Sequence, residues 1–303
     1  MSCRWFTRVL ALFLFAAYAS LAAHAYDAIV VFGDSYNDVG NIHIIAGNLG
    51  VDYPPAPYYD GRFSNGPIWV EHVASSWSLP MLPSLVPGGT DYAVGGAELL
   101  QAVTLDGALT IPSIEDQVAY YLATHRGHAD PKALYIIEGG GNDIIGSTDL
   151  SEANAVKLGG NIASGLVGIV ATLEAAGAKS FLVPDLLDVG QLPVTLVEPA
   201  FSLFADEASA AANAGLNLQL AAYPRTGGVT IFRIPVFHTF LDVAKAKAHF
   251  GFTNVTTPCV LTSGLTVVSE CADPDHSLWW DAEHPSEFAH GFFAVLVESA
   301  IPE

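Results

Sequence analysis

Positively charged residues are scarce in this sequence. Lys and Arg number 11 against 31 Asp and Glu in 303 residues, which gives a formal net charge of −20. Such a chain lacks the basic surface that displaces counterions from a nucleic acid, so no nucleic-acid partner is expected. The same charge disfavours attraction to anionic lipid head groups. The ligands that remain are neutral or cationic small molecules, bound by an enzyme or by a binding domain.

Charged residues of both signs are also few, at 14% of the chain, whereas 51% of the residues are hydrophobic. This is the opposite of the composition of a disordered protein. The length allows one large domain or two modest ones. No internal repeat or low-complexity linker divides the chain, so we expect a single domain over residues 26–303.

Long apolar runs are absent except near the N-terminus. Arg4 and Arg8 precede an apolar stretch over 9–21, and the small residues Ala23 and Ala25 follow it. This pattern is typical of a secretory signal peptide and is too short for a comfortable membrane span. We expect residues 1–25 to be removed, which would leave a secreted, extracellular or periplasmic chain with no transmembrane segment. An uncleaved N-terminal anchor is the alternative.

Cysteine is rare as well. The sequence has three, and Cys3 belongs to the predicted signal peptide. Cys259 and Cys271 remain, and an even pair in an exported chain predicts a disulfide. Two free thiols are the alternative. The chain has no Cys-x-x-Cys or His-Glu-x-x-His pattern, so a metal site is not expected, and nothing else indicates a cofactor.

Short apolar runs alternate with longer helical stretches. Strands are predicted over 27–32, 92–94, 133–137, 180–183 and 229–234. Helices are predicted over 67–77, 113–126, 151–176, 201–223, 237–250 and 286–299. Near-continuous apolar strands are typical of a parallel sheet that is covered on both faces. The alternation therefore predicts an α/β fold of three layers, and the longest irregular region is expected over 253–277.

A candidate nucleophile follows the first predicted strand, where Gly33-Asp34-Ser35 stands. Ligands of parallel sheets lie beyond the carboxyl ends of the strands, and Gly33 permits a sharp turn there. A serine that only caps the next helix is the alternative, and it would be preferred if this motif stood alone. The motifs below favour the nucleophile.

Asp281 and His284 form a candidate acid–base pair. Pro285 can occupy the first turn of the predicted helix that follows, which places His284 at the helix start and Asp281 one turn upstream. The carboxylate can then contact imidazole Nδ1, and Nε2 stays free to accept a proton from a serine. His276 has Asp273 at the same spacing but no helix start behind it, so it ranks second. A salt-bridged surface cap is the alternative.

Two glycine-rich segments are candidate donors to an oxyanion. The segment 139–143 (GGGND) follows a predicted strand, and the Asn142 amide can donate a hydrogen bond. Gly95 and Gly96 follow the short predicted strand at 92–94, so their backbone N–H groups are not shielded by side chains. The Lys and Ser or Thr of a phosphate-binding P-loop are missing.

The order of these motifs resembles that of the GDSL, or SGNH, hydrolase family. The resemblance lies in 32–41 (FGDSYNDVGN), the Gly96 segment, 140–143 (GGND) and 281–285 (DAEHP). Tyr36 stands where the family's name has Leu. The stretch 61–67 (GRFSNGP) is similar to one in a subgroup of secreted lipolytic esterases, lecithinase/haemolysins and lipid acyltransferases.

The resemblance implies a flavodoxin-like α/β/α sandwich and a role for each candidate residue. Ser35 would be the nucleophile, His284 the base and Asp281 its partner. The oxyanion would be held by the Ser35 and Gly96 N–H groups and by Asn142.

The function implied is that of a secreted serine esterase or lipase, which hydrolyses small-molecule or lipid carboxylic esters through an acyl-enzyme. A phospholipase, a lipid acyltransferase and a non-catalytic lipid- or carbohydrate-binding relative are the alternatives. The aromatic loop 53–59 can shape a pocket for the acyl or the alcohol half, or can simply fill space.

Overall fold

The computed structural model describes residues 25–105, 107 and 109–301. The predicted signal peptide therefore lies outside the described residues, apart from its last residue.

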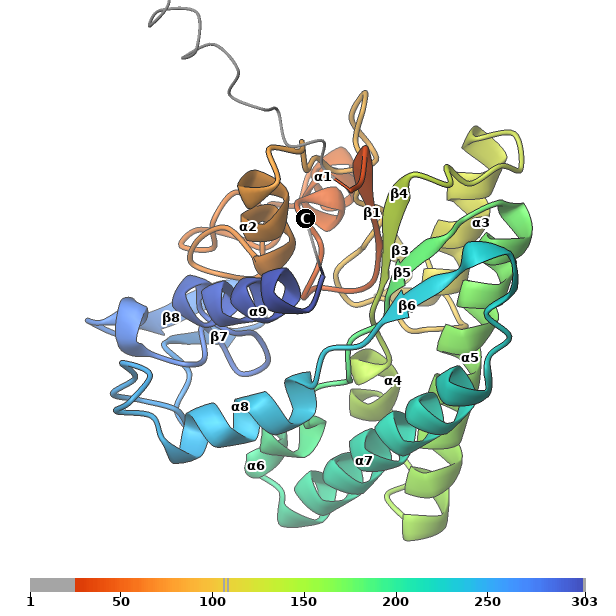
Figure 1. Ribbon diagram of the computed structural model, residues 1–303. Coiled ribbons are helices and arrows are strands. Elements are labelled where there is room, and N and C mark those ends of the chain that lie inside the picture. The colour runs from red at the N-terminus through yellow and green to blue at the C-terminus, as the bar shows by residue number, and fades with distance from the viewer. Residues whose placement is uncertain (1–24, 106, 108, 302–303) are drawn as a thin grey trace, which may run out of the picture.

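Four parallel strands form the central sheet in the order β1-β4-β5-β6 (Figure 1). Their bounds are Ala28–Phe32 (β1), Ala133–Ile137 (β4), Ser180–Leu182 (β5) and Thr230–Phe232 (β6). All five residues of β4 are buried, as a strand covered on both faces requires. Each of these strands lies within a predicted one. The strand predicted over 92–94 was wrong: the residue before it, Asp91, makes an isolated bridge to Val31 of β1, and no strand follows.

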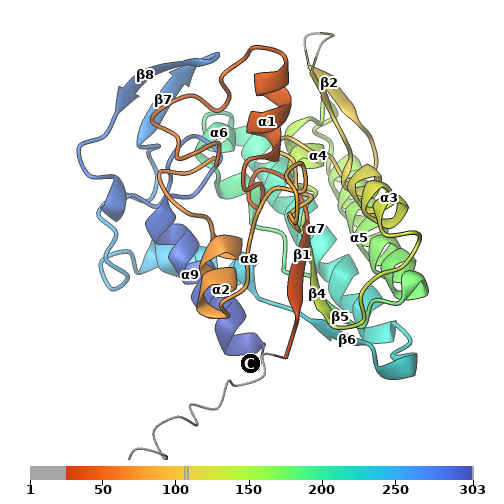
Figure 2. The ribbon, with the colours of Figure 1, turned by 90° about the horizontal axis from the view of Figure 1, so that it is seen from above.

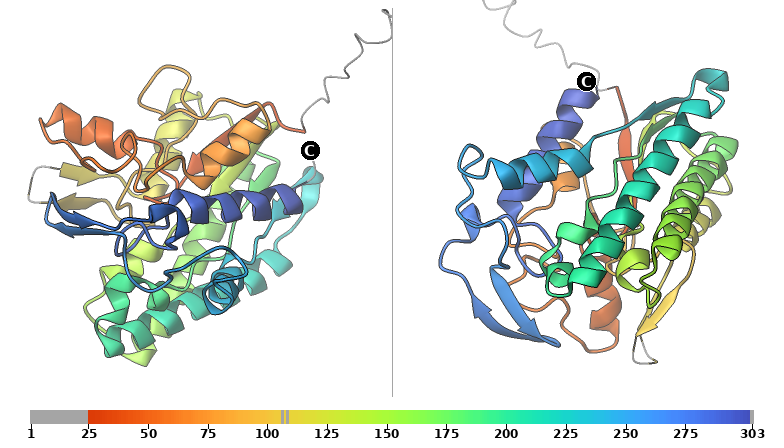
Figure 3. Two further views of the ribbon diagram at one scale, coloured as in Figure 1. Left: turned by 90° about the vertical axis from the view of Figure 1, so that its left-hand side faces the viewer. Right: turned by 90° about the horizontal axis from the view of Figure 1, so that it is seen from below.

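Helices cover both faces of the sheet and complete the predicted α/β/α sandwich. Their bounds are Asn41–Asn48 (α1), Trp69–Ser76 (α2), Ile114–Thr124 (α3), Gly141–Ile145 (α4), Glu152–Ala176 (α5), Pro193–Leu196 (α6), Pro199–Ala222 (α7), Val236–Lys245 (α8) and Glu287–Ala300 (α9). Helices α3, α5 and α7 lie on one face, and α2, α8 and α9 lie on the other (Figure 3).

Serine caps fix the starts of two of these helices where the sequence predicts them. The Ser113 hydroxyl accepts a hydrogen bond from Asp116 N, and the Asp116 carboxylate accepts one from Ser113 N, which is a capping box. The Ser151 hydroxyl accepts from Asn154 N at the start of α5. Gly177 ends α5 with φ of 118°, a conformation that favours glycine.

Helix α5 is long and apolar enough to cross a membrane by length and composition alone. It packs along α7 and against β4, and a row of its small and aliphatic side chains is buried there. Its hydropathy is thus that of a core helix in the described part of the chain.

Two hairpins and three short helices were not predicted. The hairpins are β2 (Val103–Leu105) with β3 (Leu109–Ile111), and β7 (Val260–Ser263) with β8 (Thr266–Glu270). The second hairpin lies in the region expected to be irregular. Most residues of β7 and β8 are exposed, so the pair carries no apolar pattern from which it could be predicted.

Candidate active site

Four segments that are distant in the sequence meet at the carboxyl edge of the sheet. Figure 2 shows this edge beside α1, α4, α6 and the β7–β8 hairpin. Ser35 follows β1, and Asn142 follows β4 in the first turn of α4. The turn at Gly96 and the loop from Asp281 to His284 complete the group. Helix α9 begins at Glu287 rather than at Pro285, because Ser286 caps it by accepting from Ala289 N.

The backbone before Ser35 is held by a side chain from α3. Gln117 accepts a hydrogen bond from Gly33 N at 3.0 Å and donates one to Gly33 O at 2.8 Å. A Cβ on Gly33 would lie 2.3 Å from Asn37 Nδ2, so this position has no room for a side chain. Ser35 itself is only 7% exposed. The turn therefore presents the hydroxyl in one fixed place.

Ser35, His284 and Asp281 form a continuous hydrogen-bonded chain. His284 Nε2 lies 2.7 Å from Ser35 Oγ, and His284 Nδ1 lies 2.8 Å from each carboxylate oxygen of Asp281. The backbone N–H groups of Glu283 and His284 donate to Asp281 Oδ1. Tyr58 donates its hydroxyl to Asp281 Oδ2 at 2.7 Å. Three donors besides the imidazole thus fix the carboxylate, which in turn fixes the imidazole.

Asp281 and His284 each stabilise the charged form of the other. Burial opposes protonation of His284, but the Asp281 charge and hydrogen bond outweigh it, so the pKa of the imidazole lies above its ordinary value. Burial also opposes ionisation of Asp281, yet the charge and hydrogen bond of His284, together with the hydrogen bonds from Glu283 N and the Tyr58 hydroxyl, hold the pKa of the carboxyl below its ordinary value. Asp281 is therefore charged at neutral pH, next to an imidazole that binds a proton readily.

Aromatic rings enclose the imidazole. Phe63 stacks on His284 with ring centroids 4.7 Å apart, and Tyr36 lies near it at 5.7 Å. The Tyr36 hydroxyl donates to Glu283 O at 2.5 Å, which attaches the turn after β1 to the loop before α9. The residue that follows Ser35 thus fixes the two loops relative to each other.

Two backbone donors at the edge have no hydrogen-bond acceptor. Within the described residues, neither Ser35 N–H nor Gly96 N–H donates to a protein atom. Gly95 N is occupied, because it donates to Asp38 Oδ2 at 2.8 Å. Gly96 has φ of 82°, so glycine suits the position. Of the two glycines, only Gly96 can offer its N–H to a ligand.

The Asn142 side chain lies at the same edge. Its Nδ2 atom donates to Ala97 O at 3.0 Å and makes a long contact of 3.3 Å with Asp34 Oδ2. Burial raises the pKa of Asp34 to about 6. The Asn142 N–H that points to Asp34 makes the weaker of the two hydrogen bonds, so it is the one that could be donated to an oxyanion instead.

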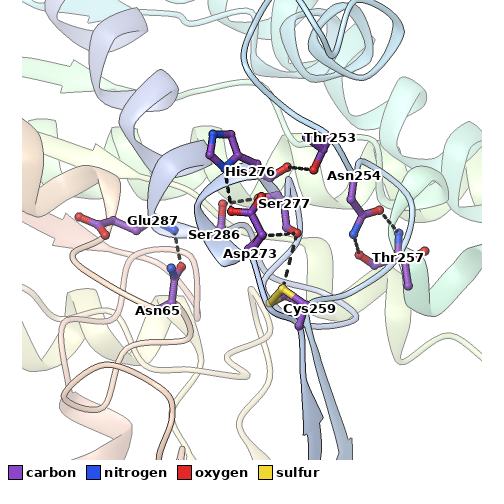
Figure 4. The surroundings of a disulfide bond; sticks show 11 residues. Asn65, Thr253, Asn254, Thr257, Cys259, Asp273, His276, Ser277, Ser286 and Glu287 are labelled. Carbon is purple, nitrogen blue, oxygen red and sulfur yellow. Dashed lines mark hydrogen bonds and ion pairs between the residues drawn. A yellow bond between two sulfur atoms is a disulfide. The ribbon is translucent and has the colours of Figure 1, made fainter.

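The second-ranked histidine lies elsewhere. His276 Nδ1 contacts Asp273 at 2.7 Å on an exposed loop, as Figure 4 shows. The same figure shows Asn65, which accepts from Glu287 N and so attaches the segment 61–67 to the start of α9. Arg62 pairs with Glu71 at 2.7 Å, which makes it a structural ion-pair partner.

The disulfide predicted between Cys259 and Cys271 is present at the base of the β7–β8 hairpin. Cys259 N donates to Trp279 O, and Val260 N donates to Trp280 O. The hairpin is therefore attached directly to the segment that leads into Asp281.

Removal of this disulfide tests its structural contribution. The double substitution Cys259→Ser and Cys271→Ser should lower the free energy of unfolding by about 3 kcal/mol, because the reduced unfolded chain gains the entropy of an open loop. Chemical denaturation under oxidising conditions measures the difference between variant and wild type. An unchanged free energy of unfolding would show that the disulfide does not stabilise the domain.

Several contacts of the site were not predicted from the sequence. Tyr58 was assigned only to an aromatic loop, and nothing in its neighbours indicates that it reaches Asp281. Gln117 and Asp38 likewise act on the backbone of residues far away in the chain. Their partners are set by tertiary packing, which leaves no local pattern.

Known proteins that are similar to this chain include lipolytic enzymes. The family described as GDSL-like lipase/acylhydrolase matches residues 29–297. The thermolabile hemolysin of Vibrio parahaemolyticus is 26% identical over 93% of this chain and 66% of its own length. The phosphatidylcholine-sterol acyltransferase of Aeromonas hydrophila is 26% identical over 84% of this chain and 72% of its own length.

A crystal structure of a lipolytic G-D-S-L family protein from Veillonella parvula is also similar. It is 16% identical, with 90% of this chain and 96% of that one covered at a TM-score of 0.44. The family match itself spans nearly the whole described chain. The chain belongs to the GDSL-like lipase/acylhydrolase family and is an ester-bond hydrolase.

Proposed function

We propose that this protein is a secreted serine esterase or lipase that hydrolyses carboxylic esters through an acyl-enzyme on Ser35. The observation that carries the proposal is the chain of hydrogen bonds from Ser35 Oγ through His284 to Asp281. A purely structural serine cap needs neither the imidazole nor the unpaired N–H groups beside it. A non-catalytic binding protein would not need a serine, a histidine–aspartate pair and two further oxyanion donors in one place either.

The reaction follows from the positions of these atoms. Ser35 Oγ attacks the ester carbonyl carbon and gives its proton to His284 Nε2, which lies 2.7 Å away. Asp281 stabilises the imidazolium that forms. The N–H groups of Ser35 and Gly96 and the amide of Asn142 stabilise the oxyanion. His284 then protonates the leaving alcohol, and a water molecule, deprotonated by His284, releases the acid.

Transfer of the acyl group to another alcohol uses the same groups. The similarity to an acyltransferase supports this second candidate, in which an acceptor alcohol takes the place of water. A panel of p-nitrophenyl esters from acetyl to palmitoyl, with phosphatidylcholine as a further substrate, tests hydrolysis. Mass analysis of the products with glycerol or a sterol present separates the two reactions. A free acid as the main product supports hydrolysis, and a new ester supports transfer.

The proposed role of Asn142 has a direct test. We expect Asn142→Ala to lower kcat by about 10²–10³-fold, because one donor to the oxyanion is lost. KM should change little, since the donor acts mainly when charge develops on the oxygen. Steady-state kinetics on a short-chain p-nitrophenyl ester measures both constants. A rise in KM at unchanged kcat would instead place Asn142 in substrate binding alone.

Secretion is part of the proposal and rests on the residues before Tyr26. Expression of the full chain with its natural N-terminus in a host that exports proteins should give an active protein outside the cytoplasm. Its first residue should be Tyr26 by N-terminal sequencing. A protein that keeps residues 1–25 would support the alternative of an N-terminal anchor.

A further inference from the structure

Two carboxylates hold the turn that carries Gly96. On one side of this glycine, Gly95 N donates to Asp38 Oδ2 at 2.8 Å, and on the other side Leu99 N donates to Asp143 Oδ2 at 3.0 Å. Between these two attachments, Gly96 N–H donates to no protein atom of the described residues. The candidate oxyanion donor is therefore free for a ligand while the backbone around it is fixed.

Each carboxylate belongs to a segment that carries another candidate donor. Asp38 lies three residues after Ser35, in the turn between β1 and α1. Asp143 directly follows Asn142 in the first turn of α4. The two hydrogen bonds span 57 and 44 residues of sequence, and they join the Gly96 turn to the Ser35 turn and to α4. All three segments that supply candidate oxyanion donors are linked in this way.

The surroundings of Asp38 require a carboxylate. Besides Gly95 N, the backbone N–H groups of Gly40, Asn41 and Ile42 donate to it, and the side chain is fully buried. An amide in its place would turn an NH₂ group towards these N–H donors and leave some of them without an acceptor. Asp38 thus also fixes the start of α1, so a substitution there affects the fold as well as the turn.

Asp143 allows a more selective test. In the described part of the chain, Leu99 N is the one atom of another residue that donates to its carboxylate. An Asn at this position keeps one acceptor oxygen for Leu99 N, whereas an Ala keeps none. The two variants therefore separate the hydrogen bond from the negative charge.

We propose that Asp143 and Asp38 are positioning residues, which hold the Gly96 N–H group and Asn142 where the oxyanion forms. The inference rests on the proposed hydrolysis at Ser35, and neither carboxylate touches the reacting atoms. Glycine has more backbone freedom than any other residue, so the pair at 95–96 needs outside contacts to keep one conformation. Donors must also be held to within about 0.5 Å of their working positions, because their effect depends on distance to the developing charge.

The substitution Asp143→Ala tests the proposal through turnover. It should lower kcat for a short-chain p-nitrophenyl ester by roughly 10-fold to 100-fold, which is less than the loss of a whole donor. KM should change by less than about threefold, because the donors act mainly when charge develops. Asp143→Asn should keep kcat within about threefold of the wild type, since its amide oxygen still accepts from Leu99 N. An unchanged kcat in Asp143→Ala, or equal losses in both variants, would overturn the proposal.

The matched control is Asp149→Ala. The Asp149 carboxylate accepts from Ser151 N at 3.0 Å, which is the same type and length of hydrogen bond, but it lies on an exposed loop before α5. This variant should keep the kcat and KM of the wild type. A loss of kcat equal to that of Asp143→Ala would assign the effect to general destabilisation and overturn the proposal. Asp143→Leu, which is similar in size but has no acceptor, replaces Asp143→Ala if that variant does not fold.

Crystal structures of the wild type and Asp143→Ala provide a readout that needs no turnover. The distance between Ser35 N and Gly96 N should change by about 0.5 Å or more in the variant. An unchanged distance would overturn the positioning role. A changed distance in a protein that hydrolyses no ester would support the role of Asp143 in the turn and contradict the proposed function. Full hydrolysis by Asp143→Ala that is lost in Ser35→Ala would support the function and overturn this inference.

Discussion

Replacement of Ser35 by alanine is expected to lower kcat for a p-nitrophenyl ester by on the order of 10⁵–10⁶-fold. The hydroxyl is the atom that attacks in the proposed reaction, and it lies 2.7 Å from His284 Nε2. The oxyanion donors remain in the variant, so a small rate above that of water should persist.

The control for Ser35→Ala is Ser75→Ala. Ser75 is an exposed residue of α2, so its loss should change neither activity nor stability. Both variants should unfold at wild-type denaturant concentrations, which separates a chemical effect from a folding defect. Ester hydrolysis by Ser35→Ala at more than a hundredth of the wild-type rate would show that another nucleophile is used.

Asp281→Asn is expected to lower kcat by about 10⁴-fold. An amide NH₂ in place of the carboxylate favours the tautomer that carries its proton on His284 Nε2, and this tautomer cannot accept the serine proton. The matched control is Tyr58→Phe, which removes one hydrogen bond from Asp281 but leaves its charge, so it should cost tenfold or less.

The pH dependence of the same variant tests the electrostatic account. The Asp281 charge raises the pKa of His284, so wild-type kcat/KM should fall as pH decreases through a value above the ordinary 6.5 for histidine. Without the carboxylate, burial becomes the main influence on the pKa of His284 and lowers it. The acid limb of Asp281→Asn should therefore lie at lower pH than that of the wild type. An acid limb that does not move would show that another group titrates.

The three side chains of the hydrogen-bonded chain in the candidate site could be singled out from the sequence, whereas most of the residues that hold them in place could not. Ser35 follows a strand, and Asp281 lies three residues before His284, so local rules place both. The contacts of Tyr58 with Asp281 and of Gln117 with Gly33 join segments that are more than 80 residues apart. No periodicity or motif within one segment encodes such a contact.

The same distinction holds for the fold. Buried strands such as β4 have apolar residues throughout, and Ser113 and Ser151 mark helix starts, so these elements follow from the sequence. The β7–β8 hairpin does not, because its side chains are mostly exposed. Its disulfide joins the two ends of the hairpin, and the backbone hydrogen bonds of Cys259 and Val260 attach it to the domain. The short strand predicted over 92–94 is not formed, since the bridge to β1 is made by the single residue before it, Asp91.

Labelling by a fluorophosphonate probe tests the central claim most directly, because the reaction requires a serine hydroxyl beside a base and oxyanion donors. Intact mass and peptide mapping should show one covalent adduct on Ser35 in the wild type and none in Ser35→Ala. An adduct on another serine, or an unmodified protein that still hydrolyses esters, would contradict the account.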